Sequence, residues 1–99
     1  MFSILPDWAK NLGSAFFSDR VSNPPKSESP VWKEFDSYRG SIKTNGESGK
    51  NRQYYEWDYT HNDIEVHDKS GNHLGSMNPV TGDIYKSPVI CRDIKDKIK

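Results

Sequence analysis

Residues 54–68 read YYEWDYTHNDIEVHD, a stretch in which aromatic or aliphatic side chains alternate with polar ones. Alternation with a period of two is typical of β-strands that pack one face against a core. The pattern therefore predicts strands over residues 54–60 and 63–68. His61 and Asn62 are the expected central residues of a tight hairpin turn, since Asn tolerates the positive φ that such turns need.

The predicted hairpin has an apolar face and an acidic face. In this register Asp58 lies directly opposite Glu65, with Cβ atoms roughly 5 Å apart. Two carboxylates at that separation repel each other by about 3 kcal/mol at an effective dielectric of about 20, so a proton, a cation or the imidazole of His61 has to offset the repulsion. The expected core face comprises Tyr55, Trp57, Tyr59, Ile64 and Val66, and the expected acidic face comprises Glu56, Asp58, Asp63, Glu65 and His67.

A carboxylate beside a protonated imidazole is a general base beside a general acid. Such a pair suits attack by a ribose 2′-hydroxyl on the adjacent phosphate, with Glu65 taking the hydroxyl proton and His61 protonating the departing 5′-oxygen. Lys86 or Arg92 would stabilise the charge that builds on the phosphorane oxygens. This reaction needs no metal, and only RNA carries the nucleophile. The alternative is a solvated hairpin face on which clustered acids serve solubility alone.

Further elements are expected on both sides of the hairpin. Turn residues separate it from two more strands, over residues 73–77 and 83–87, which completes an antiparallel meander of about four strands. Residues 31–38 fit a helical turn or a short strand, and residues 39–53 fit a mobile basic loop.

The N-terminal part has a helical period instead. Apolar side chains recur there at a spacing of three to four residues and predict a short helix over residues 6–17, followed by a Ser/Pro-rich linker. The expected fold class is α+β, with residues 1–30 as helix and linker and residues 31–99 as one compact domain. The helical stripe comprises Trp8, Leu12, Ala15 and Phe16.

Composition limits the possible classes of protein. With 99 residues, 32% of them hydrophobic, the chain can form one domain with a modest core. No apolar run reaches the ~20 residues of a membrane span, and no secretory signal pattern is visible. Cys91 is the single cysteine, so no internal disulfide can form.

Charge is balanced overall but unevenly distributed. The 14 basic and 14 acidic residues give a formal net charge of zero, which argues against indiscriminate nucleic-acid binding. The acidic hairpin contains no Lys or Arg, however, and basic residues flank it on both sides. These flanks are candidates for holding RNA at its rims: Arg39, Lys43, Lys50 and Arg52 before the hairpin, and Lys95 after it.

The three histidines are weak candidates for a metal site. His61, His67 and His73 follow one another at six-residue spacing, which matches no compact ligand motif, and no cysteine lies among them. We expect no metal ion and no cofactor.

A specific pattern of residues extends from position 54 to about position 95. It consists of Tyr55-Glu56-Trp57-Asp58, His61, Glu65, His73-Leu74-Gly75-Ser76, Pro79, Thr81-Gly82, Lys86, Pro88 and Arg92. This pattern resembles the cytotoxic ribonuclease domain of cloacin and of the ribosomal-RNA-cleaving colicins. Related toxin tips occur in contact-dependent inhibition proteins and in other bacterial competition systems.

The resemblance implies a metal-independent endoribonuclease that cuts small-subunit (16S) ribosomal RNA in the decoding centre, leaves a 2′,3′-cyclic phosphate and halts translation. The family's fold is a strongly twisted antiparallel sheet with a short N-terminal helix. Its catalytic Asp, His and Glu fall on Asp58, His61 and Glu65, and its transition-state Lys and Arg fall on Lys86 and Arg92.

The resemblance also implies a setting and partners. Such a domain is exported or delivered as part of a larger toxin and acts in the cytoplasm of the target bacterium, where its partner is the ribosome. A cognate immunity protein, usually acidic, protects the producing cell.

The chain departs from the family in charge. Family domains carry a dense run of Lys and Arg before the motif, and residues 39–52 are a much thinner version of it. Two alternatives therefore stay open: a toxin ribonuclease that acts on tRNA or other RNA, and a non-catalytic interaction module.

Overall fold

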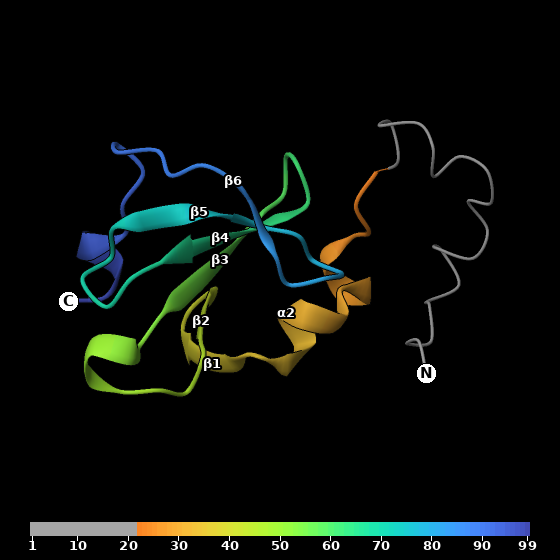
Figure 1. The fold of residues 1–99 in the computed structure, drawn as a ribbon. Coiled ribbons are helices and arrows are strands. Elements are labelled where there is room, and N and C mark those ends of the chain that lie inside the picture. The colour runs from red at the N-terminus through yellow and green to blue at the C-terminus, as the bar shows by residue number, and fades with distance from the viewer. Residues whose placement is uncertain (1–21) are drawn as a thin grey trace.

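A computed structural model of the chain describes residues 22–99, and the helix expected over residues 6–17 lies outside them. The described part is built on a six-stranded antiparallel sheet in which each strand pairs with the next along the chain (Figure 1). The strands are β1 (Asp36–Arg39), β2 (Ile42–Thr44), β3 (Tyr54–Asp58), β4 (Asp63–His67), β5 (His73–Met77) and β6 (Ile84–Lys86). The helices are short: η2 (Lys26–Glu28), α2 (Pro30–Glu34), η3 (Gly49–Asn51) and η4 (Lys95–Lys97).

The expected meander is confirmed as β3 to β6, but the sheet is larger than predicted. Residues 31–38 contain most of α2 and most of β1, and β2 lies inside the segment expected to be a loop. Ile42 is the only apolar residue of β2, which is too few to produce a visible alternation in the sequence. None of the helices within residues 22–99 is long and apolar enough to cross a lipid bilayer.

One face of the sheet packs against α2. The helix begins because Ser29 caps it, accepting a hydrogen bond from the Trp32 amide, and because a proline occupies its first turn. Trp32 then packs edge-to-face on Trp57 with ring centroids 5.7 Å apart. The buried cluster comprises Trp32, Tyr55, Trp57, Ile64 and Val66, which confirms four of the five predicted core residues.

Tyr59 is the exception, because its side chain is 70% exposed. The sequence placed it in a strand that continues to residue 60, whereas β3 ends at Asp58 and leaves Tyr59 in the turn.

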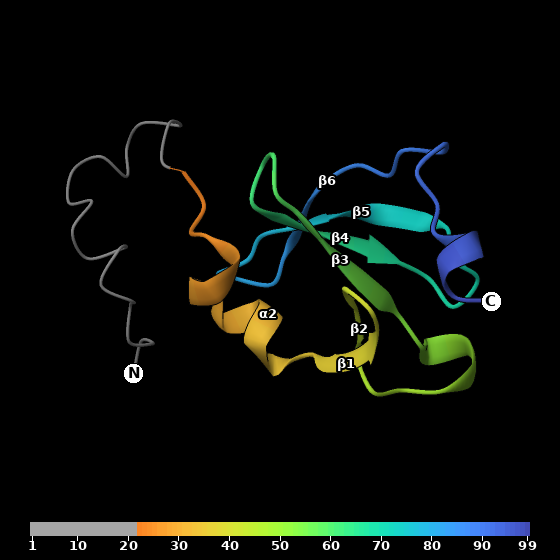
Figure 2. The same ribbon diagram turned by 180° about the vertical axis from the view of Figure 1, so that it is seen from behind.

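The opposite face of the sheet is covered by the C-terminal segment. Ile94 packs there with Ile42 and Tyr54, and its amide donates to the carbonyl oxygen of Gly71 at 3.0 Å. Lys97 adds an ion pair with Glu56 at 2.7 Å. Figure 2 shows that α2 and the C-terminal η4 lie at opposite ends of the sheet. The alternative of a solvated acidic face is therefore wrong, since Asp63, Glu65 and His67 are all buried.

Because His67 is buried, we expect the stability of the fold to depend on pH. Its ring is wholly buried and neither nitrogen has a hydrogen-bond partner among residues 22–99. Burial lowers the pKa of His67, and the neighbouring His73 ring adds to this effect. Below pH ~6.5 the His67 ring therefore takes up a proton when the protein unfolds. As the pH falls further, the free energy of unfolding should decrease by up to about 1.4 kcal/mol per pH unit, until the pH reaches the lowered pKa of His67 in the folded state.

Denaturant unfolding at pH 7.5, 6.5 and 5.5 measures this loss, and His67→Leu is the control because it removes the titrating group. The wild type should lose stability across this range and the variant should lose less. Equal slopes for the two proteins would show that His67 does not cause the dependence.

Gly75 allows β5 and β6 to approach each other closely. Its φ is +144°, and a Cβ at this position would lie 2.5 Å from the carbonyl oxygen of Lys86. Gly75→Ala should destabilise the fold by about 1–3 kcal/mol and displace β6, which carries Lys86.

Denaturant unfolding measures the loss of stability. Gly40→Ala is the matched control, since Gly40 also has a positive φ (+54°) but its added Cβ would meet nothing within 4 Å. Equal losses in the two variants would mean that backbone strain, and not contact with β6, is responsible.

Candidate active site

The turn between β3 and β4 differs from the predicted two-residue turn. Asp58 pairs with Asp63, and residues 59–62 form the loop between them. Asp58 causes the longer loop: its Oδ1 accepts hydrogen bonds from the amides of Thr60 (2.9 Å) and His61 (3.2 Å), and its carbonyl oxygen accepts from Asn62 (2.7 Å). Asn62 adopts a φ of +54°, in agreement with the expected role of Asn in the turn.

The predicted contact between Asp58 and Glu65 is consequently wrong, since Glu65 pairs with Glu56. The register is displaced by two residues, and a displacement of two leaves every side chain on its predicted face. Asp58, Asp63, Glu65 and His67 therefore still share the side of the sheet away from α2.

Asp58 also holds the imidazole of His61. Nδ1 of His61 lies 2.9 Å from Oδ2 of Asp58, while the His61 side chain remains 59% exposed. Burial raises the pKa of Asp58, but the hydrogen bonds from His61 and Thr60 together outweigh it and lower the pKa below its usual value. Asp58 is thus a carboxylate that orients the ring, and Nε2 of His61 makes no hydrogen bond within residues 22–99.

Glu65 is a buried carboxylate with an exposed cationic partner. Its side chain is 6% exposed, and Oε1 lies 3.2 Å from the guanidinium of Arg92. Oε1 also contacts Nε2 of His73 at 2.6 Å, and the Ser76 hydroxyl lies 3.0 and 3.1 Å from the two carboxylate oxygens. Oε2 has fewer partners than Oε1, so it retains capacity to accept a proton.

His73 is fixed in one tautomer by the backbone. The amide of Val89 donates to Nδ1 of His73 at 2.9 Å, so Nδ1 is an acceptor and the ring hydrogen is on Nε2. Nε2 therefore donates to Glu65. His73 and Ser76 together hold the carboxylate in one orientation.

Asp63 is wholly buried and is the partner of Lys86. It also accepts hydrogen bonds from the Tyr85 hydroxyl and, at 2.8 Å, from the Asn23 side-chain amide. The hydrogen bond to Asp63 raises the pKa of Lys86, so the ammonium is charged at neutral pH. Burial, and then the hydrogen bond to Asp63, raise the pKa of Tyr85.

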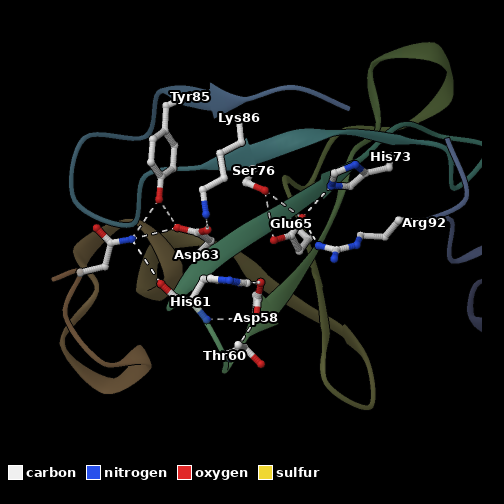
Figure 3. Close-up of polar contacts among 11 residues, drawn as sticks. Asp58, Thr60, His61, Asp63, Glu65, His73, Ser76, Tyr85, Lys86 and Arg92 are labelled. Atoms are coloured by element: carbon white, nitrogen blue, oxygen red, sulfur yellow. Dashed lines mark hydrogen bonds and ion pairs between the residues drawn. The ribbon is translucent and has the colours of Figure 1, made fainter. Parts of the chain in front are cut away.

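The five catalytic residues predicted from the sequence thus come together on one face (Figure 3). Together with Asp63 they form three pairs around β4, in which each carboxylate contacts at least one side chain that is charged or can be charged. The pairs are Asp58 with His61, Asp63 with Lys86, and Glu65 with Arg92. Lys86 and Arg92 are about half exposed, so both cations are accessible to a ligand.

A metal ion fits this arrangement poorly. Asp58, His61 and Asp63 offer ligand atoms within 4.8 Å of one another. Asp63, however, already binds the ammonium of Lys86, and Nδ1 of His61 already binds Asp58. These carboxylates already bind positively charged side chains, and a metal ion would have to displace Lys86 from Asp63. The rings of His67 and His73 lie 5.3 Å apart, but both nitrogens of His73 are engaged, with Glu65 and with the Val89 amide.

The candidate RNA-binding residues lie in different surroundings. Lys43 is partly buried, donates to the carbonyl oxygen of Trp32 at 2.9 Å and lies 4.8 Å from the Trp32 ring centroid, so it supports the core. Arg52 donates to the carbonyl oxygen of Glu47 at 2.9 Å, and Arg39 donates to that of Lys97 at 3.2 Å. Lys50 and Lys95 are exposed.

Several residues that support the site had no assigned role in the sequence. His73 and Ser76 are polar positions in an otherwise apolar strand, which is a detectable signal for a buried polar contact. Asp63 was placed on the acidic face but its pairing with Lys86, 23 positions away, has no local signal. Asn23 had none either, since it lies in a segment expected to be a linker.

Known proteins and protein families include sequences similar to this chain. The model of the family described as Cytotoxic matches residues 38–95. Colicin E3 of Escherichia coli is 47% identical over 47 residues, which cover 46% of this chain and 8% of that protein. Colicin-E6 of Escherichia coli has the same identity and coverage. The chain thus spans less than a tenth of the length of these relatives, and the family match covers more than half of the chain. The resemblance to the colicin cytotoxic domain is confirmed: the chain belongs to the Cytotoxic family.

Proposed function

We propose that the chain is the catalytic domain of a toxin ribonuclease that cleaves RNA by transesterification without a metal ion. The observation that carries this proposal is the set of three carboxylate pairs on one face of the sheet. It combines an enclosed carboxylate at Glu65, an accessible imidazole nitrogen on His61 and two accessible cations. Membership of the Cytotoxic family supports the same conclusion.

In the proposed reaction, Oε2 of Glu65 removes the proton from a ribose 2′-hydroxyl. The 2′-oxygen attacks the adjacent phosphorus while the bond from phosphorus to the 5′-oxygen breaks. His61 donates a proton from Nε2 to that 5′-oxygen, and Asp58 holds the ring in place. The products are a 2′,3′-cyclic phosphate and a 5′-hydroxyl.

Lys86 and Arg92 have a double role in this scheme. Each is held by a carboxylate in the free protein, yet each keeps about half of its side chain exposed. Both can therefore contact the non-bridging oxygens as negative charge builds on the phosphorane. We propose that Arg39, Lys50, Arg52 and Lys95 add weaker contacts to RNA phosphates, with Lys43 contributing mainly through the core.

We propose small-subunit (16S) ribosomal RNA in the decoding centre as the substrate, by virtue of the resemblance to ribosomal-RNA-cleaving colicins. A second candidate is tRNA, which the thin basic segment of residues 39–52 motivates because that segment offers fewer phosphate contacts than the dense Lys/Arg run of family domains. Incubating the protein separately with ribosomes and with total tRNA decides between them. We expect a single cut in small-subunit ribosomal RNA. Preferential cleavage of tRNA would instead make tRNA the substrate.

The setting is also a proposal. Because the match covers 8% of each colicin, we propose that the domain is part of a larger exported toxin that acts in the cytoplasm of the target bacterium. An acidic immunity protein would protect the producing cell. Coexpression with an acidic protein encoded next to the toxin should then restore translation, and a neighbouring protein that gives no protection would contradict this part.

A further inference from the structure

A pocket lies at the end of the β3–β4 hairpin, next to the catalytic turn. It has a volume of about 480 Å³, which is within the usual range for sites that hold a small ligand. Aromatic and basic side chains make up most of its lining: Lys26, Trp32, Lys33, Trp57 and Tyr59, together with Asn62. The three pairs on β4 do not include any of these residues.

Aromatic rings form the walls of this pocket. Trp32 and Trp57 are nearly perpendicular, with an interplanar angle of 69°, and both are buried apart from the surface they present to the pocket. Tyr59 extends from the turn and is largely exposed. An exposed aromatic ring beside two buried ones is suited to stacking on a flat ligand.

Positive charge lies at the rim. Nζ of Lys26 is 5.7 Å from the Trp32 ring centroid and 5.2 Å from that of Tyr59, and it donates a hydrogen bond to the Tyr59 hydroxyl at 2.7 Å. Lys33 is exposed beside it. The pocket thus combines flat apolar walls with ammonium groups, and a nucleotide combines a flat base with a phosphate.

The pocket is also joined directly to the catalytic turn. Tyr59 and Asn62 line it, and they are the first and last residues of the loop that carries His61. The hairpin ends where the two faces of the sheet meet, so one RNA strand that crosses the turn can contact both the paired carboxylates and the pocket.

We propose that this pocket binds one nucleobase next to the scissile bond, with the base stacked on Tyr59 and the phosphate near Lys26. The inference rests on the proposed ribonuclease function and adds a specificity site to it. Lys26, Trp32 and Lys33 precede the family match at residues 38–95, whereas Trp57, Tyr59 and Asn62 lie within it, so the pocket is built from both parts of the chain.

The test combines binding with kinetics. The chain is titrated with each of the four nucleoside 3′-monophosphates while the indole N–H signals of Trp32 and Trp57 are followed by NMR. Steady-state cleavage of RNA is then compared for wild type, Tyr59→Ala and Tyr59→Phe. Ile90→Ala is the control for loss of an exposed apolar side chain, since Ile90 is 95% exposed and does not line the pocket.

At least one nucleotide should shift both indole signals. Tyr59→Ala should raise KM for RNA about tenfold, the loss expected for one stacked base, and change kcat by less than about twofold. Tyr59→Phe should retain the wild-type KM because it keeps the ring, and so should Ile90→Ala. Lys26→Ala should weaken the dependence of KM on salt, and Lys69→Ala, an exposed lysine elsewhere, should not.

Failure of the pocket proposal can be distinguished from failure of the proposed function. If wild type cleaves RNA but Tyr59→Ala keeps the wild-type KM, the pocket is not a base site and the proposed function stands. If wild type cleaves no RNA, the proposed function fails and the titration alone decides about the pocket. Indole signals that no nucleotide moves would then overturn this inference as well.

Discussion

Glu65→Gln should reduce RNA cleavage by about a hundredfold to ten-thousandfold, the contribution usually made by a general base. The amide keeps the shape of the side chain but cannot take up the proton of the 2′-hydroxyl. Its oxygen can still accept hydrogen bonds from His73 and Ser76, so the strand position should be retained. Single-turnover cleavage of RNA measures the loss of activity, and a thermal unfolding curve measures whether the fold is retained.

The matched control is Glu56→Gln. Glu56 lies directly opposite Glu65 in the β3–β4 register, on the same face, and its partner is Lys97 at the C-terminal end. This variant should keep near wild-type cleavage. Equal losses in the two variants would indicate a general effect of acidic charge and would contradict the role of Glu65 as base.

His61→Ala should cause a loss of similar size, about a hundredfold to ten-thousandfold, because the departing 5′-oxygen loses its proton donor. Stability should change by no more than about 0.5 kcal/mol, since the ring is mostly exposed and the hydrogen bond from the Thr60 amide to Asp58 remains. The same cleavage assay and denaturant unfolding measure the two effects.

Asp58→Asn separates the orientation of His61 from its chemistry. An asparagine oxygen still accepts the turn hydrogen bonds, but the charge beside Nδ1 of His61 is gone. We expect an intermediate loss of activity, smaller than that of His61→Ala.

A His61→Ala variant as active as wild type would rule out His61 as the acid and would favour the non-catalytic alternative.

The division of the hairpin into two faces was predictable because the period of a strand is two, and it holds for Tyr55, Trp57, Ile64 and Val66. The pairing was not predictable from the same pattern. Asp58 binds the amides of its own turn, which lengthens the loop and displaces the register by two residues. A displacement by two residues leaves each side chain on the same face of the sheet, but it changes which residues lie opposite each other on the two strands.

The composition of the site was predictable, but its enclosure was not. An alternating strand shows which residues share a face and not what covers that face. Here the cover comes from β6 and the C-terminal segment, which bring Lys86 to Asp63 and Arg92 to Glu65. The link from Asn23 to Asp63 spans 40 positions, and no local pattern encodes it.

The chemistry of the cut ends tests the account most directly. Purified ribosomes are incubated with the protein in the presence of a chelator, and the ends of any RNA fragment are analysed; a parallel sample contains an oligomer with a 2′-deoxyribose at the cleaved position. We predict a 2′,3′-cyclic phosphate and a 5′-hydroxyl at the cut, and no cleavage of the deoxy-substituted oligomer. Ends with a 5′-phosphate, or cleavage of the deoxy-substituted oligomer, would contradict it.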